Sequence, residues 1–281
     1  MIAVCPNPYR DSGLHITKKI LSLLKDQGVE AVVCPVFADD DPSVLPEDVQ
    51  SHSLKDIAGA CDMAIVVGGD GTLLAVARQI YQVSIPILGV NLGTKGFMCA
   101  LEPGEIELIA RAVKGEMKIS SRMTLDVTVE RRGEVVCSDW ALNDVVIHGY
   151  GDCVKLTARC GESMITSYSG DGMILSTPTG STGYSMSAGG PIVEPDACNI
   201  ILSPICAHMM GARSFVLSPE RTVTVATEKL HGRRAYLSVD GNPVLDLANG
   251  DVIKVSQSRH RTLMVDLGLK SFFEMAYEKL T

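Results

Sequence analysis

A carboxylate framed by glycines lies early in the chain, in the stretch VVGGDGTLLAVAR at 66–78. Three glycines surround Asp70, although each glycine in a regular element costs about 1 kcal/mol relative to alanine. The pattern indicates either that a ligand approaches the backbone closely or that the turn needs backbone angles that glycine tolerates. A carboxylate beside phosphates holds Mg²⁺ or takes a proton from an attacking hydroxyl. The alternative is a tight turn in which Asp70 is only a polar filler.

A second polar segment, SGDGMILSTPTGSTGYSMSAGGPIVEP at 169–195, is dense in glycine, serine and threonine. Hydroxyls and backbone N–H groups at this density suit the ribose and phosphate groups of a polar ligand. Tyr184 offers a ring face on which a base can stack. Apolar residues towards both ends of the segment argue against the alternative, a flexible linker.

The elements that must position Asp70 alternate between strand and helix over the first 118 residues. We expect strands at 1–6, 29–36, 63–67 and 85–91, and helices at 11–27, at 54–60, from about residue 72, and at 104–114. This alternation, with fully apolar strands, predicts a parallel sheet covered on both faces. Ligands bind at the carboxyl ends of such strands, where the Asp70 turn lies, and Thr72 is expected to cap the helix that follows.

The pattern changes near residue 119. From there, apolar and polar residues alternate in many short segments, with a turn expected at Arg132-Gly133. One helix-like segment near 183–190 interrupts them, and the tail at 271–280 is again helical. The sequence therefore predicts an α/β domain followed by a β-rich domain.

Composition restricts the partners and the compartment. The 281 residues suffice for two domains, and the net charge of -8 argues against a nucleic-acid partner. The nine cysteines include no CxxC pair and lie mostly in apolar runs, so we expect reduced, buried thiols of a cytoplasmic protein. The N-terminus lacks a signal-peptide pattern, and no apolar stretch reaches about 18 residues, so no membrane partner is expected.

Several motifs together resemble the NAD kinase family. They are GGDGT at 68–72, NLGTKGF at 91–97, NDVV at 143–146, DGMILSTPTGSTGYSMSAGGPI at 171–192, ILSPICAH at 201–208 and SVDG at 238–241. Their order and spacing are similar to those of the family over nearly the whole chain. GGDGT alone is shared with lipid kinases and resembles the GGDG of 6-phosphofructokinases. The Thr/Ser/Gly block, together with the pair of Asn and an acid, singles out NAD kinases.

The resemblance implies an α/β plus all-β architecture. A Rossmann-like parallel α/β domain would span 1–118, a β-sandwich-like domain 119–264, and a C-terminal segment, 265–281, would return to the first domain. NAD would bind between the domains and partly against a neighbouring subunit of a homodimer or homotetramer. Asp70 would be catalytic, near the adenosine ribose, with no metal held by the protein alone. The residues implied to contact the substrates are Gly69, Gly71, Thr72, Phe97, Asn143, Asp144, Asp171, Thr179, Thr182, Gly183, Tyr184 and Asp240.

Three positions depart from the family pattern. Asp144 stands where the family usually has Glu, which shortens the acid by one methylene. Gly183 stands where the family usually has Ala. Lys95 replaces an apolar residue, and it either adds a positive charge near phosphates or is a solvated lysine.

The reaction implied by the resemblance is transfer of the γ-phosphoryl group of ATP to the 2′-hydroxyl of the adenosine ribose of NAD. Mg²⁺ would be carried by the triphosphate. Two alternatives are a non-catalytic NAD(P)-binding sensor and a lipid kinase that shares GGDGT. The intact Asp70 argues against the first alternative, and the polar block at 169–195 argues against the second. The use of polyphosphate as donor or NADH as acceptor stays open.

Overall fold

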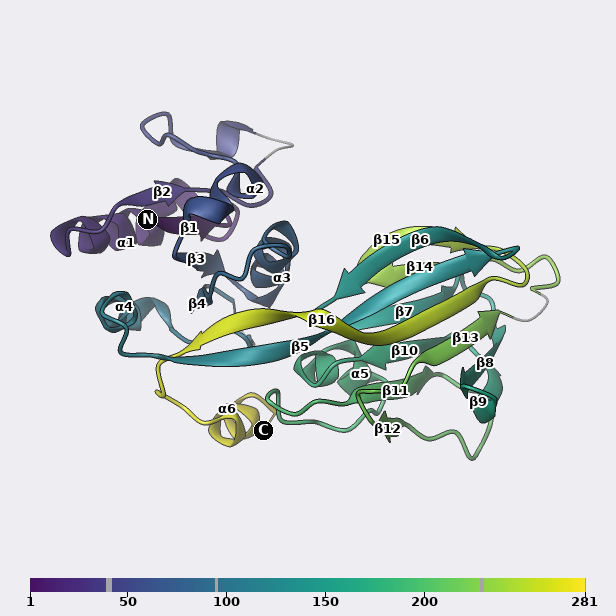
Figure 1. Ribbon diagram of the computed structural model, residues 1–281. Coiled ribbons are helices and arrows are strands. Elements are labelled where there is room, and N and C mark those ends of the chain that lie inside the picture. Colours follow the sequence, from purple (N-terminus) through teal and green to yellow (C-terminus); the bar gives the residue numbers. More distant parts are fainter. Residues whose placement is uncertain (39–41, 94–95, 228–229, 281) are drawn as a thin grey trace. The chain divides into compact units, whose positions relative to one another are not determined.

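The computed structural model describes residues 1–38, 42–93, 96–227 and 230–280 and divides into two compact units, coloured by sequence in Figure 1. Unit 1 consists of residues 1–121 and 262–281, and unit 2 of residues 122–261. Lys95, one of the three departures from the family pattern, lies outside the described residues.

Unit 1 is built on a parallel sheet in the order β2-β1-β3-β4. Its strands are β1 (Ile2–Pro6), β2 (Ala31–Val33), β3 (Met63–Gly68) and β4 (Ile87–Asn91). Its helices and 3₁₀ turns are η1 (Ser12–Leu14), α1 (His15–Asp26), η2 (Pro42–Val44), α2 (Leu54–Ile57), η3 (Ala58–Ala60), α3 (Asp70–Gln79), η4 (Pro103–Leu108), α4 (Ile109–Val113) and α6 (Phe272–Leu280). All residues of β1, β3 and β4 are buried, as expected for a parallel sheet covered on both faces.

Two long strands, β5 (Lys118–Arg131) and β16 (Val252–Asp266), run across the boundary between the units. The end of β16 pairs with β4 in parallel through Met264 and Ile87, and its first half pairs with β13 (Val223–Thr227) of unit 2. Val265 and Leu267 are buried in the core cluster of unit 1. The end of β16 and the residue that follows it are therefore part of the core of the first unit.

Unit 2 consists of antiparallel sheets. The first sheet contains β6 (Glu134–Ala141), β8 (Val154–Cys160), β9 (Ser163–Gly170) and β13, together with parts of β5 and β16. The second sheet has the order β12-β11-β10-β7-β14-β15, with β7 (Asp144–Gly149), β10 (Gly172–Ser176), β11 (Ile200–Ile205), β12 (Phe215–Leu217), β14 (Ala235–Val239) and β15 (Asn242–Leu247). The short helical elements η5 (Thr179–Thr182) and α5 (Tyr184–Ser187) follow β10.

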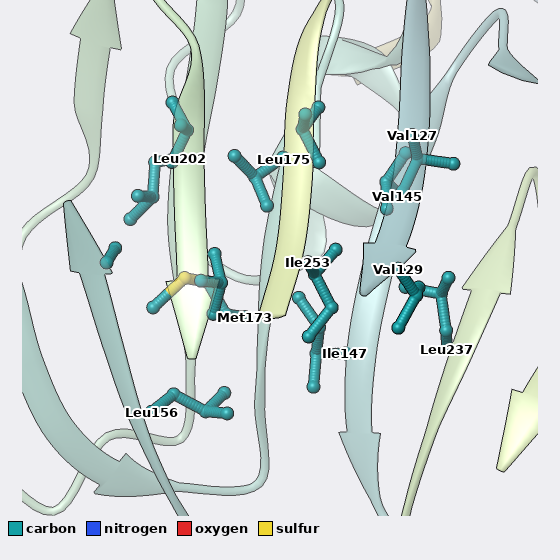
Figure 2. Packing of buried hydrophobic residues seen from close by; sticks show 14 of the residues in the cluster. Val127, Val129, Val145, Ile147, Leu156, Met173, Leu175, Leu202, Leu237 and Ile253 are labelled. Atoms are coloured by element: carbon teal, nitrogen blue, oxygen red, sulfur yellow. The ribbon is translucent and has the colours of Figure 1, made fainter. Parts of the chain in front are cut away.

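The inner faces of these sheets form one hydrophobic core, part of which Figure 2 shows from close by. Val145 and Ile147 come from β7, whereas Val127 comes from β5 and Ile253 from β16. All four side chains are at most 1% exposed. Burial of alternate residues from two sheets in one core is the packing of a β-sandwich.

The predicted fold class, a parallel α/β domain and a β-sandwich-like domain, is confirmed. The turn at Arg132-Gly133 joins β5 to β6, and both residues have positive φ, as two-residue hairpin loops require. The helix expected from residue 11 begins at His15, because Gly13 and Leu14 have positive φ and cannot belong to a right-handed helix. The carboxylate of Asp11 accepts the N–H groups of Ile16 and Thr17 in the first turn of α1.

The cysteines depart from expectation in burial. All nine are free thiols, but four are buried, four are half-buried and Cys206 is exposed. The expectation of mostly buried thiols was therefore wrong for five of the nine.

Candidate active site

The glycine turn of unit 1 joins the buried strand β3 to α3. None of Gly68, Gly69 and Gly71 has a positive φ, so backbone angles do not explain them. A Cβ atom on Gly68 would lie 2.4 Å from Oγ1 of Thr72, whereas a Cβ on Gly69 or Gly71 would meet nothing within 4 Å. Gly68 therefore serves packing, and the two other glycines leave open space beside the turn.

Thr72 takes part in the cap of the helix, but from the third helical position and not as the N-cap residue. Helix α3 begins at Asp70 with Gly69 as its N-cap, and the N–H of Thr72 donates to the carbonyl of Gly69. The hydroxyl of Thr72 instead accepts hydrogen bonds from the N–H of Gly69 (3.4 Å) and from Nδ2 of Asn7 (3.2 Å). Thr72 thus ties the first turn of α3 to the segment that follows β1.

Asp70 is held by the backbone of a neighbouring segment. Its Oδ2 accepts the N–H of Phe97 at 2.8 Å, and its Oδ1 accepts the N–H of Met98 at 3.2 Å. A Cβ on Gly96 would lie 2.7 Å from Oδ1 of Asp70, so glycine is needed at 96 for this close approach. Burial raises the pKa of Asp70 above its ordinary value, while the two N–H bonds and the charge of Lys279 act in the opposite direction. The carboxylate is therefore both fixed in place and a better proton acceptor than an exposed aspartate.

A hollow of about 370 Å³ opens beside Asp70. Its lining is Asn7, Arg10, Phe37, Gly69, Asp70, Gly71, Thr72, Asn91, Gly93 and Gly96. Among these residues Arg10 is the only cation. The volume lies within the usual range for ligand sites. Anionic ligand groups would here meet a guanidinium group and the first turn of α3, whose helix dipole favours negative charge.

Sequence reasoning missed Asn7, Arg10 and Asn91 as lining residues. Asn7 follows β1, whose residues pair in register with β3, and Asn91 ends β4 on the other side of β3. Polar residues at the carboxyl ends of neighbouring parallel strands meet at one edge, so the PNP segment at 6–8 was a usable signal. Phe97, a predicted site residue, is half-buried, and Nζ of Lys279 lies 5.4 Å from its ring centre.

In unit 2, the turn from Leu142 to Asp144 is held by Asp240. Oδ2 of Asp240 accepts the N–H of Leu142 at 2.9 Å, and its Oδ1 accepts those of Asn143 (2.7 Å) and Asp144 (3.0 Å). The carboxylate of Asp240 therefore faces the backbone of this turn.

Two polar atoms beside this turn are buried without a partner. They are Oδ1 of Asn143 and Oγ1 of Thr179. Such atoms cost stability unless something satisfies them, and a bound ligand is one explanation. Gly180 brings the two segments together, because a Cβ there would lie 2.2 Å from the carbonyl oxygen of Asn143.

Asp144 is a buried acid, only 6% exposed. Burial, and then the charge of Asp240, raise the pKa of Asp144 to about 7. Both causes disfavour the charged form, and neither is a hydrogen bond. A ligand that donates hydrogen bonds to this carboxylate would relieve part of that cost.

The hydroxyls of the block at 169–195 are used mostly within the protein. Thr177 donates to the carbonyl of Leu142 at 2.6 Å, and Ser181 donates to the carbonyl of Val193 and accepts its N–H. Thr182 donates a long bond, 3.4 Å, to the carbonyl of Thr179. The density of hydroxyls thus mainly fixes the turn, which the sequence interpretation had assigned to ligand contacts.

Tyr184 lies near Asp144, whereas Asp171 lies at the other end of β10, where its carbonyl accepts the N–H of Gly149. The ring of Tyr184 is 41% exposed and stacks on His148 with centroids 5.7 Å apart. Its pKa is raised by burial first, and the charges of Asp171 and Asp144 contribute to the same rise. Gly183, between η5 and α5, has a negative φ, and a Cβ there would lie 3.3 Å from the carbonyl oxygen of Gly180. The structure therefore brings Asn143, Asp144, Thr179 and Asp240 together at one turn, but it leaves Asp171 at the opposite end of β10.

Two family profiles match this chain. The ATP-NAD kinase N-terminal domain matches residues 2–117, and the ATP-NAD kinase C-terminal domain matches residues 142–267. An NAD kinase from Acetivibrio thermocellus is 37% identical over 283 residues, with 99% of this chain and 96% of that protein covered. One from Geobacter sulfurreducens is 41% identical over 229 residues, with 80% of each covered.

Solved structures of the same kind are also similar. Yeast NADH kinase complexed with NADH has a TM-score of 0.86 and 26% identity, with 99% of this chain and 86% of that chain covered. An NAD kinase from Archaeoglobus fulgidus in complex with ATP has a TM-score of 0.75 and 25% identity, with coverages of 100% and 98%.

A parallel α/β unit with a glycine-framed carboxylate beside a hollow, joined to a β-sandwich with unpaired polar atoms beside a buried acid, is the architecture of a protein that binds a polar, phosphate-bearing ligand. The matches identify which one: the chain belongs to the NAD kinase family and is an enzyme of that family. Neither alternative function, the non-catalytic sensor or the lipid kinase, is favoured by these matches. Among the described residues, no helix combines the length and the apolar character needed to cross a membrane.

Proposed function

We propose that Asp70 accepts the proton of the 2′-hydroxyl of the adenosine ribose as that oxygen attacks the γ-phosphorus of ATP. The new bond joins the 2′-oxygen to the γ-phosphorus, and the bond from that phosphorus to the bridging oxygen breaks, which yields NADP and ADP. The proton passes from Asp70 to solvent. The observation that carries this role is a buried carboxylate with a raised pKa that borders a hollow next to the open faces of Gly69 and Gly71. A raised pKa makes a carboxylate a stronger base near neutral pH.

The hollow of unit 1 is the proposed place of the triphosphate of ATP. Gly69 and Gly71 let phosphate oxygens approach the backbone, and Thr72 fixes the turn. Arg10 supplies positive charge on the same wall. In phosphoryl transfer, most of the rate enhancement comes from positioning and charge stabilisation, which these residues provide.

The adenosine end of NAD is assigned to unit 2. Oδ1 of Asn143 is a buried acceptor, and Oγ1 of Thr179 is a buried hydroxyl oxygen, both without a protein partner. We assign them, with Asp144, to the amino and hydroxyl groups of adenosine. Tyr184 offers an exposed ring face for stacking, and Asp171, Thr182 and Gly183 complete the proposed contacts of unit 2. Phe97, whose N–H donates to Asp70, is proposed as a contact in unit 1.

ATP-using kinases work with a divalent cation, and we propose Mg²⁺ for this one. Within the described part of the chain, no three His, Cys, Asp or Glu side chains are grouped so that they could hold a metal ion. Mg²⁺ commonly binds through substrate phosphates and few protein carboxylates. The side chains present therefore fit a cation that arrives with the triphosphate, where it neutralises phosphate charge.

A homodimer or homotetramer in the cytoplasm is the proposed state of the enzyme. The free thiols suit a reducing compartment. Phe273 and Tyr277 of α6 are 66% and 73% exposed, and Val216 of the edge strand β12 is 52% exposed. Phe273 and Tyr277 are four residues apart and so share one face of α6, and this exposed aromatic face supports contact with a second copy.

The test incubates the protein with NAD and MgATP and measures NADP. Parallel reactions replace ATP with polyphosphate and NAD with NADH, which defines the range of donors and acceptors. Absence of NADP, together with calorimetric binding of NAD, would favour the non-catalytic sensor. Formation of NADP that persists in Asp70→Asn at more than a tenth of the parent rate would remove Asp70 as the base.

A further inference from the structure

The backbone of the turn from Leu142 to Asp144 is tied down on one side by Asp240. The carboxylate of Asp240 accepts all three N–H groups of this turn at 2.7 to 3.0 Å. In return, the N–H of Asp240 donates to the carbonyl of Asp144 at 2.9 Å. Asp240 itself has a φ of +47°, a left-handed conformation that aspartate adopts more readily than most residues other than glycine. The pairing between Asp240 and the turn is thus reciprocal.

On the other side, the segment after β10 satisfies the carbonyl groups. The N–H of Thr177 donates to the carbonyl of Asn143 at 2.9 Å, and its hydroxyl donates to that of Leu142 at 2.6 Å. Ser176 adds a bond of 3.2 Å to the carbonyl of Asn143. Every backbone polar group of the turn therefore has a partner within the protein. The side chains of Asn143 and Asp144 are what the turn presents to a ligand.

We propose that Asp240 is a positioning residue for NAD: it acts through Asn143 and Asp144, which it aims, and makes no contact with the nucleotide itself. The inference rests on the proposed function, in which those two side chains hold the adenosine end. It replaces the direct contact that the family resemblance implied for Asp240. The ligand groups that fit the aimed acceptors are hydrogen-bond donors, such as ribose hydroxyls and an exocyclic amine.

Position 240 requires a carboxylate because three backbone N–H groups donate to this one side chain. An aspartate has two oxygens and about four acceptor sites, and three of these are used here. An asparagine keeps one acceptor oxygen and adds an NH₂ group that would face N–H donors. The choice has a side effect, since the negative charge of Asp240 lies close enough to Asp144 to raise its pKa.

The first experiment compares Asp240→Asn with Asp251→Asn. Asp251 is the matched control, because it is fully buried in unit 2, accepts the N–H of Ala248 at 2.8 Å and pairs with Arg131. Both variants should lower Tm. We expect Asp240→Asn to raise the Kd and KM for NAD tenfold or more and to leave the KM for ATP within about twofold. Asp251→Asn should leave the KM for NAD unchanged. An unchanged Kd for NAD in Asp240→Asn would overturn the proposal.

The second experiment separates positioning from contact with a double-mutant cycle measured by calorimetry with NAD. If Asp240 acts through its neighbours, Asp240→Asn will add little to the loss already caused by Asn143→Ala with Asp144→Ala. If Asp240 touches NAD, the losses will add, and the proposal fails. Asn143→Ala alone tests the proposed function separately, because unchanged affinity there removes Asn143 from the site whatever Asp240 does.

The pH dependence of kcat/KM for NAD is a further test, because it should not change if Asp240 has only a structural role. Asp144 is faced by Asp240 and by Tyr184, whose pKa is itself raised. Removing the charge at 240 should move the titration of Asp144 in kcat/KM for NAD to lower pH. Asp240→Glu keeps the charge but displaces it, so it should raise the KM for NAD with little movement of the profile. Should Asp240→Asn fail to fold, a parent-like KM for NAD in Asp240→Glu would overturn the proposal.

Discussion

Both units use an aspartate to fix a backbone segment, but they divide its tasks differently. In unit 1, Asp70 alone accepts the N–H groups of Phe97 and Met98 and borders the hollow. In unit 2, Asp240 accepts the three N–H groups, and a second acid, Asp144, is left for the ligand. One carboxylate can thus serve structure and chemistry together, whereas Asp144 is buried without backbone hydrogen bonds that would stabilise its charge.

Replacement of Asp70, which serves both structure and chemistry, should have the largest effect on turnover. Asp70→Asn removes the base but leaves one oxygen to hold the segment at 97–98, so we expect turnover to fall by about 10²- to 10⁴-fold. The affinity for NAD should stay within about tenfold of that of the parent. Steady-state kinetics and calorimetry measure the two quantities. A large loss of NAD binding or of folding would mean that the structural task of Asp70 outweighs the chemical one.

Replacement of the dedicated binding acid, Asp144, should raise the stability of the protein above neutral pH. The pKa of Asp144 rises from its ordinary 3.8 to about 7 on folding, so the folded state retains a proton that the unfolded state releases. The free energy of unfolding therefore falls as pH rises between these values, by up to about 4 kcal/mol in total. Asp144→Asn removes this loss. We expect the variant to be more stable than the parent at pH 8 and to weaken NAD binding.

Urea denaturation at about pH 8 and about pH 4.5 measures this effect. The stability gain of Asp144→Asn should shrink markedly at the lower pH, where the acid in the parent is protonated. Asp152→Asn, a change at an exposed position, is the control and should show no such gain. A gain of equal size at both pH values would show that ionisation of Asp144 is not its cause.

Two glycines of unit 1 can be tested separately: Gly68, which packs against Thr72, and Gly69, which leaves room for a ligand to approach the backbone. Gly68→Ala would place a Cβ 2.4 Å from the hydroxyl of Thr72, so we expect a loss of about 1–3 kcal/mol in the free energy of unfolding. Gly69→Ala points into open space and should change stability by less. Its Cβ borders the hollow, so the KM for ATP should rise about tenfold. Equal loss of stability in both variants would contradict the separation.

The smallest effect is expected at Gly183. Its Cβ would lie 3.3 Å from the carbonyl oxygen of Gly180, which is tight contact but not a clash, and its φ is negative. Gly183→Ala should change the free energy of unfolding by less than about 1 kcal/mol. It should change the KM for NAD by less than about threefold, as measured in the same assay. A loss of several kcal/mol would show that the turn at 180–183 cannot yield by a few tenths of an ångström.

The strands and turns could be predicted from the sequence, but the residues that line the hollow could not. Apolar strands, the alternating pattern after residue 119 and the Arg132-Gly133 turn are local signals, and each predicts its element from residues within a few positions. The hollow beside Asp70 depends instead on the register of β1 against β3, which places Asn7 beside a turn more than sixty residues away. Hydrophobic patterning sets the strands but does not say which polar residues meet at their ends.

The roles of individual hydroxyls and carboxylates were less predictable. Thr177 and Ser181 carry hydroxyl groups that could bind a ligand. These hydroxyls instead donate hydrogen bonds to the carbonyls of Leu142 and Val193. A side chain that satisfies a backbone group and one that awaits a ligand share one sequence pattern. Only the hydrogen-bond partners in the structure distinguish the two kinds of side chain. Asn143 and Thr179 stand out because each has a buried oxygen atom without a partner.

The long strand β16 has a consequence for the order in which the chain can fold. Met264, Val265 and Leu267 are at most 5% exposed in the core of unit 1, yet they follow the whole of unit 2 in the sequence. During synthesis, the first 121 residues emerge without the segment that completes their sheet, so unit 1 remains unfinished until residues 262–267 have left the ribosome. Unit 2 is continuous in sequence and can fold earlier. Late closure over such a sequence separation is a slow, entropically costly step.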